Sequence, residues 1–319
     1  MEASSSRCAW ALLLLAIFSG LDAIAATPAA TVVTRAAPCN GSKDGSPCPP
    51  ATPGPAGAVT IDGKPAPPPS APFAMGETLV YEVDWMGIDV GSVTSKAEPG
   101  VMMTNGRSAI HLSASGSSNR SFSLFYSARG AEESWIDSSG LFSLGFVHDE
   151  NYGGQVDHQT WSMDYPASLA HRHRVRKKKS APTATTDLDV PLTMTNVQDE
   201  YSATYFYRAF PLKVGQKLEM DVFQDKDIWK ISVEALAKET IKVPAGTFDC
   251  LKVRPTATRN GVALKKGEMT VWVTDDAKRI PVKTQASTPF GKVNAVLTSW
   301  SQQGIPAPSP SPAATTKSQ

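Results

Sequence analysis

The side chains best suited to chemistry in this 319-residue chain are its five histidines, and their spacing matches no known catalytic or metal-binding pattern. Only His171 and His173 are close enough in sequence to suggest that both bind the same metal ion. The chain contains no His-Glu-x-x-His motif, no Gly-x-Ser-x-Gly nucleophile turn and no glycine-rich phosphate loop. The pair Asp275 and Asp276 is typical of a turn and lacks the length and glycine of a calcium loop. We therefore expect a non-catalytic protein without a metal or another cofactor.

A run of basic residues, His171 to Lys179, carries the strongest local charge. One interpretation is a patch for phosphate-rich lipid headgroups, lipopolysaccharide or another polyanion. The other is a solvated loop between strands, which the Ser-Ala-Pro-Thr segment that follows favours. The net charge of the whole chain is only +1, so no global field attracts nucleic acid, and we expect no such partner. The candidate polyanion-binding residues are Arg172, Arg174, Arg176, Lys177, Lys178 and Lys179.

A set of aromatic residues offers a different kind of site, an apolar cavity for an acyl chain or a similar ligand. Ordinary packing of the core explains the same residues equally simply. Arg208 lies at the end of the predicted helix and could pair with a carboxylate such as Glu132 or Glu133. The candidate cavity residues are Tyr81, Trp85, Phe125, Trp135, Tyr201, Tyr205, Phe206 and Arg208, with Trp272 as a further aromatic.

The cysteines outside the N-terminal segment divide into a pair and a single residue. Cys39 and Cys48 flank a flexible loop of Gly, Ser, Asn and Asp, and we expect a disulfide between them in an oxidising compartment. Metal binding is a weaker alternative because no histidine flanks them. Cys250 lies in a strand-like apolar context, which predicts a small buried hydrophobic residue rather than a nucleophile.

The N-terminus has the pattern of a secretory signal peptide. Arg7 precedes an apolar run from Ala9 to Leu21, and Ala23-Ile24-Ala25 supplies the small residues that a signal peptidase accepts, which places cleavage before Ala26. The apolar run is shorter than the roughly 20 residues of a membrane-spanning helix, although an uncleaved anchor is the alternative. No later segment is apolar enough to span a bilayer, so we expect export to the periplasm of a Gram-negative bacterium, without integral membrane character after cleavage.

The composition of the rest of the chain predicts one folded domain between two disordered segments. Residues 26–72 form a leader rich in Pro and Ala, and residues 304–319 repeat this composition as a tail. Residues 73–303 have the length of a single domain.

Within this domain, apolar and polar residues alternate in many short segments, which is typical of half-buried strands. Turns rich in Gly, Pro, Asp and Asn separate them, so the sequence predicts a large antiparallel sheet, curled or closed. One segment lacks this alternation: Tyr201, Tyr205 and Ala209 follow a helical spacing, which predicts a short helix with Asp199 near its N-cap and its aromatic side against the sheet. The predicted strands include Leu79–Trp85, Ser108–Ala114, Ser121–Ala128, Ala131–Ile136, Leu144–His148, Gln159–Met163, Ile228–Ala235, Glu239–Val243, Phe248–Pro255, Glu268–Thr274, Ile280–Gln285 and Val293–Trp300.

The order of several short motifs resembles a family of exported bacterial proteins, the domain of unknown function family DUF3108. The resemblance begins at Phe73 to Trp85, continues at Gln198-Asp199 and Tyr207-Arg208, and includes Val243 to Phe248 with Cys250 and Val271 to Asp276. It implies a periplasmic protein with no assigned enzymatic activity. It also implies a curved, incompletely closed antiparallel sheet with a small helix in or near its concavity, similar to lipoprotein-carrier proteins.

We therefore expect a non-catalytic envelope protein that binds an apolar or amphiphilic ligand, such as a lipid, or an envelope protein partner. A structural or assembly factor that acts through its surface is the alternative, and an enzyme on cell-wall or lipid material is the least supported.

Overall fold

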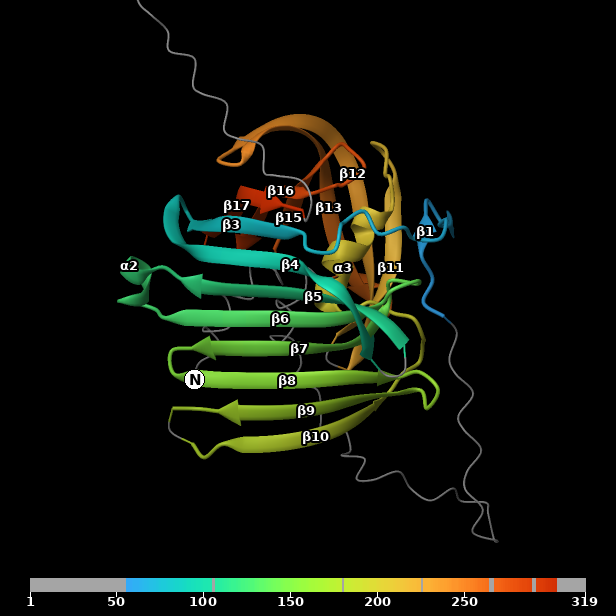
Figure 1. Cartoon of the computed structure of the whole chain (residues 1–319), viewed down its shortest axis with the longest axis vertical. Helices are drawn as coiled ribbons and strands as arrows, with labels where there is room; N and C mark the ends of the chain where they lie inside the picture. Colours follow the sequence, from blue (N-terminus) through green and yellow to red (C-terminus); the bar gives the residue numbers. More distant parts are fainter. Residues whose placement is uncertain are drawn as a thin grey trace, which may run out of the picture.

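A computed structural model of the chain describes residues 56–302, except for 105–106, 180, 225, 264–266 and 289–290 (Figure 1). The predicted signal peptide, the Cys39–Cys48 disulfide and the C-terminal tail lie outside the described residues. The fold is mainly β, as predicted, and consists of one large sheet that does not close. Among the described residues, no helix is long and apolar enough to cross a bilayer.

The sheet is built from two antiparallel meanders. In the first, each strand pairs with its neighbour in sequence from β3 to β10, and in the second the same holds from β11 to β17 apart from the short β14, which pairs with β13 only. The first meander consists of β3 (Thr78–Trp85), β4 (Ile88–Thr104), β5 (Arg107–Ser118), β6 (Ala128–Asp137), β7 (Ser143–Tyr152), β8 (Gln155–Asp164), β9 (Leu169–Lys177) and β10 (Ala184–Pro191). The second consists of β11 (Lys217–Gln224), β12 (Asp227–Val243), β13 (Gly246–Arg259), β14 (Val262–Ala263), β15 (Met269–Thr274), β16 (Pro281–Thr288) and β17 (Gly291–Ser301).

One pairing joins the two meanders into a single sheet: β17 lies antiparallel beside β3, with Leu297 opposite Tyr81. At the other end of the second meander, two short strands, β1 (Thr60–Ile61) and β2 (Lys64–Pro65), add to the edge of β11. Further along the same edge, Gln198 forms a bridge with Val222. Strands β3–β10 run across Figure 1, whereas β11–β13 stand upright in the same view, so the sheet curls around its own interior.

The helix α3 (Glu200–Phe206) lies inside this curl and continues into the short 3₁₀ helix η2 (Tyr207–Ala209) (Figure 1). Its N-cap is Asp199, as predicted, and the Asp199 carboxylate accepts a hydrogen bond from the Ser202 amide at 2.7 Å. Tyr201, Ala203 and Tyr205 are buried in the main core with residues from both meanders. The helix therefore fills the concavity and gives both meanders a common surface to pack against.

Several predictions of local structure are wrong. The segment Ser121–Ala128 is not a strand, because its first residues belong to the short helix α2 (Arg120–Ser123), capped by Asn119. The basic run is not a loop, because it forms most of β9. The expected leader, residues 26–72, overlaps the sheet, since β1 and β2 pair within it. Cys250 is buried and unpaired, in agreement with the prediction.

Candidate functional site

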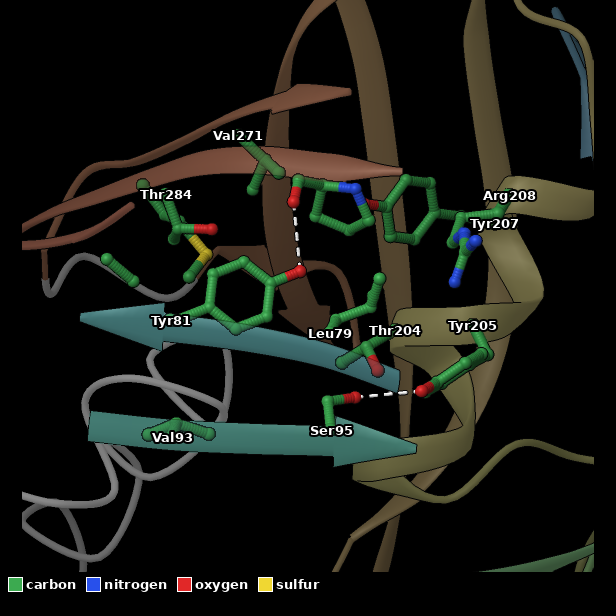
Figure 2. A pocket seen from close by; sticks show the side chains of 13 residues that line it. Leu79, Tyr81, Val93, Ser95, Thr204, Tyr205, Tyr207, Arg208, Val271 and Thr284 are labelled. Atoms are coloured by element: carbon green, nitrogen blue, oxygen red, sulfur yellow. Dashed lines mark hydrogen bonds between the residues drawn. The ribbon is translucent and has the colours of Figure 1, made fainter. Parts of the chain in front are cut away.

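A cavity lies between the helical segment α3–η2 and strands β3, β4, β15, β16 and β17 (Figure 2). The cavity has a volume of about 70 Å³. The strands place the lining residues because alternate side chains of each strand face the concave side. The lining consists of Leu79, Tyr81, Val93, Ser95, Thr204, Tyr205, Tyr207, Arg208, Met269, Val271, Pro281, Thr284 and Ala295.

Two tyrosine hydroxyls at the cavity are held by the protein itself. The Tyr81 hydroxyl donates to the carbonyl oxygen of Pro281 at 2.9 Å, and the Tyr205 hydroxyl lies 2.8 Å from Ser95 Oγ (Figure 2). Burial raises the pKa of both Tyr205 and Tyr207 to about 12, so these side chains are neutral at physiological pH. Tyr81 and Tyr205 therefore present apolar ring surface to the cavity, while their hydroxyls are already paired.

The Arg208 guanidinium is also internally satisfied. It donates two hydrogen bonds to the Glu77 carboxylate, at 2.8 and 2.9 Å, and the side chains are only 1% and 0% exposed. Arg208 also donates to the carbonyl oxygen of Lys278, and Gln302 donates to Glu77. Burial opposes the charge on Arg208, but the Glu77 carboxylate outweighs it and raises the arginine pKa. The prediction that Arg208 pairs with Glu132 or Glu133 is wrong, because its partner is Glu77. Since Glu77 offsets its charge, Arg208 presents no unpaired positive charge to the cavity.

The predicted aromatic set is only partly brought together. Tyr81 and Tyr205 line the cavity, whereas Tyr201 is hydrogen-bonded to Ser95 behind it. Phe206 packs against Phe210 in the core. The remaining members lie elsewhere: Trp135 stacks on His111, Trp272 donates to Glu239, and Trp85 and Phe125 are exposed and do not line the cavity.

The basic run is mostly neutralised by neighbouring strands. Arg174 and Arg176 both pair with the buried Asp157 of β8. His171 and His173 pair with Asp189 and Asp187 of β10. The Arg172 guanidinium lies over the Trp161 ring at 5.6 Å. Lys177, Lys178 and Lys179 are exposed and form no ion pair with the part of the chain that the structure describes.

All five histidines have a carboxylate partner on an adjacent strand. The most buried of these pairs joins His148 Nδ1 to Glu132, with Glu150 3.3 Å from the other ring nitrogen. Burial raises the pKa of Glu132, while burial of His148 is outweighed by the Glu132 carboxylate, so the pKa of His148 is raised. Within the described ranges no three His, Cys, Asp or Glu side chains could hold a metal ion together. These pairs follow from cross-strand register and do not line the cavity.

Sequence reasoning missed most of the apolar lining. Leu79 and Tyr81 were placed on one face of a strand, which is the correct face, but Val93, Val271 and Ala295 come from strands whose contact across the concavity no local pattern reveals. Glu77 was also missed, because its partner Arg208 is 131 residues away in sequence.

The fold and this site define a class of protein: an open antiparallel sheet curled around a short helix, with a small apolar cavity between them. Residues 80–298 match the sequence model of the family DUF3108, whose members are described as proteins of unknown function. The chain belongs to that family.

Three solved structures are similar to the chain at low identity. A β-barrel-like protein of the domain of unknown function DUF1849 from Brucella abortus is 7% identical, with 72% of this chain and 98% of that chain covered and a TM-score of 0.48. A candidate exported protein with a YmcC-like fold from Bacteroides fragilis is 14% identical, with coverages of 74% and 100% and a TM-score of 0.29. A candidate lipoprotein from Parabacteroides distasonis is 13% identical, with coverages of 73% and 99% and a TM-score of 0.27. No curated protein matches the chain.

Proposed function

We propose that this protein is a non-catalytic protein of the Gram-negative cell envelope that binds an apolar or amphiphilic ligand in the cavity between α3–η2 and the strands. The observation that carries the proposal is the chemistry of the lining. Leu79, Val93, Val271 and Ala295 offer apolar surface. Beside them, the hydroxyls of Tyr81 and Tyr205 and the guanidinium of Arg208 are already paired within the protein. Transfer of an apolar group from water into such a site is favourable, whereas a charged group would lose its hydration without finding a partner.

The size of the cavity limits what enters it. A cavity of about 70 Å³ holds a few methylene groups rather than a whole acyl chain. The concavity of the sheet is otherwise filled by α3 and the core around it. We therefore propose that only the end of an amphiphile, or one small apolar group, is enclosed.

Location in the envelope rests on the N-terminal sequence. The apolar run Ala9 to Leu21 and the small residues before Ala26 favour export by a signal peptide. An exported protein meets lipids and other amphiphiles of the envelope directly, which is consistent with the proposed ligand class.

Native mass spectrometry of the protein as purified from the cell, followed by organic extraction, tests the proposal. We expect a bound small molecule that is lost when the cavity is filled by Ala295→Leu. The matched control is Ala257→Leu, because Ala257 is a buried alanine of the same sheet that does not line the cavity. The proposal fails if the protein carries no ligand and takes up no fluorescent fatty acid, or if both substitutions reduce uptake equally.

A structural or assembly factor that acts through its surface is the second candidate. Exposed apolar side chains at Met86, Ile88, Leu124 and Phe125 favour it, since such residues often mark contact surfaces. Crosslinking in cells that recovers a specific protein at these residues would support this alternative, and recovery of no protein partner would weigh against it.

A further inference from the structure

Four large apolar side chains project from one end of the first meander. Met86 and Ile88 flank the β3–β4 turn and are 66% and 61% exposed. Leu124 and Phe125 follow α2 and are 82% and 89% exposed. We call these four residues the apolar tip. Transfer of apolar side chains out of water is favourable, so a group of such exposed side chains indicates a surface that contacts a partner.

The two halves of the apolar tip are fixed to each other by hydrogen bonds. The Asn119 backbone amide donates to the carbonyl oxygen of Val90 at 3.0 Å, and its side-chain amide donates to that of Asp89 at 2.9 Å. The Asn119 side chain also caps α2 by accepting from the Phe122 amide. On the other side, the Met86 amide donates to the carbonyl oxygen of Lys292. The apolar tip is therefore a defined surface held by β4 and β17.

The free lysines of the basic run lie at the same end of the sheet. The register carries one row of opposed residues from β4 to β9, and α2, the β3–β4 turn and the β9–β10 loop all lie on the left of Figure 1. This row spans six strands, or about 24 Å at ~4.8 Å between neighbours. Its members are Ser92, Ser117, Arg129, Asn151, Val156 and Lys177.

The side of this end formed by β9 is basic. Lys177, Lys178 and Lys179 are exposed, and no acidic residue occurs from 178 to 186. Near the apolar tip both signs of charge occur. Arg120, Arg129 and Lys292 are exposed, and so is Glu82, which lies opposite Ser92. Asp84 accepts from the Gly87 amide and Asp89 from the Gly91 amide, so these two carboxylates hold the turns.

We propose that this end of the sheet docks on the surface of an anionic lipid bilayer. The apolar tip enters the boundary between headgroups and acyl chains, and Lys177 to Lys179 contact lipid phosphates. Apolar side chains beside basic ones are the combination that holds proteins at membrane interfaces, because burial and attraction to anionic headgroups add. The inference is independent of the cavity and its ligand.

Flotation of the full chain with vesicles tests the electrostatic part. We expect binding to vesicles of phosphatidylglycerol and phosphatidylethanolamine to weaken about fivefold for each lysine replaced, and about a hundredfold for Lys177→Gln, Lys178→Gln and Lys179→Gln together. The matched control replaces three other exposed lysines, Lys64, Lys226 and Lys242, by glutamine. Equal weakening by both sets would overturn the proposal, since it would show only a general effect of charge.

Photo-crosslinking tests the apolar tip directly, whatever else in the chain contacts the vesicle. Phe125 is replaced by the photoreactive amino acid benzoylphenylalanine, and Val262, which is 68% exposed on another hairpin, receives the same replacement as a control. We expect lipid adducts at position 125 and none at position 262 on illumination with the vesicles. Adducts at both positions, at neither, or to a protein in place of lipid in intact cells would overturn the proposal.

Discussion

The buried pair of Arg208 and Glu77 is the residue-scale feature on which the cavity wall depends. Both charges are out of contact with water, and each satisfies the other. Removal of one partner leaves the other charge buried and unpaired, which costs far more than the pair contributes. We expect Arg208→Met to lower the free energy of unfolding by about 3–5 kcal/mol, measured by denaturant titration.

The double variant Glu77→Leu with Arg208→Met distinguishes the lost pair from lost packing. Because neither charge remains, we expect most of the stability to return. A double variant as unstable as Arg208→Met alone would show that the shape of the arginine side chain, which lies over the Tyr205 ring, is what matters.

His148 gives the stability a definite dependence on pH. Burial disfavours its charged form, but the Glu132 carboxylate raises its pKa in the folded protein above the unfolded value of about 6.5. Its contribution is therefore complete below about pH 6.5 and is lost as the pH rises through the folded pKa. We expect the stability lead of the wild type over His148→Gln to shrink as the pH increases from 6 to 9. A lead that is constant across this range would contradict the ion pair.

At the scale of elements, α3 depends on its N-cap. The Asp199 carboxylate is buried and accepts from the Ser202 amide and the Ser134 hydroxyl. We expect Asp199→Ala to cost about 2 kcal/mol, the upper end for a cap, because two buried donors lose their acceptor. The control is Asn119→Ala at the half-buried cap of the four-residue helix α2, for which we expect about 0.5 kcal/mol by thermal unfolding. Similar losses for both would mean that burial adds nothing at Asp199.

The elements that sequence patterns predicted correctly are those with one buried face and one solvent-exposed face. Leu79, Tyr81 and Val83 alternate with polar residues, and the strand is real. The basic run in β9 favours a loop in the sequence, because like charges repel one another and Ser-Ala-Pro-Thr follows. The strand forms because Asp157 and Asp189 on neighbouring strands offset these charges, which a local pattern cannot reveal. The opposite error occurs at Phe122 and Leu124, which alternate with serines as in a strand but belong to the helix α2 and its C-cap.

For the candidate site, the sequence predicts only those lining residues whose orientation follows from the pattern of their own helix or strand. Tyr205 follows from the helical spacing of α3, and Tyr81 from the buried face of β3. The side that closes the cavity, including Val271 and Ala295, is set by how far the sheet curls, which depends on pairings between distant strands. Trp85 was misplaced because it lies at the end of its strand, where the sheet no longer covers it.

At the scale of the whole molecule, the edge of β11 is protected by residues that the composition assigned to a leader. Thr60 and Ile61 pair with Glu219 and Leu218, and Val59 and Ile61 pack on the main core. An uncovered edge strand pairs with other chains. We expect a chain that begins at residue 73 to self-associate, measured by size-exclusion chromatography with light scattering, and a chain that begins at Ala56 to stay monomeric. Monomers from both would show that β11 needs no cover.

The single seam between β3 and β17 sets the order in which the fold can be completed. Every other long pairing joins strands that are neighbours in sequence or nearly so, whereas Asp84 and Asn294 are 210 residues apart and Glu77 and Gln302 are 225 apart. Hairpins between neighbours form fast, and distant pairings form slowly because the loop between them must first be ordered. A chain made from its N-terminus thus holds one wall of the cavity open until its last strand arrives. Folding intermediates of the nascent chain therefore expose the edge of β3, and Glu77 lacks its partner Gln302 in them. These are the species that a chaperone would have to protect.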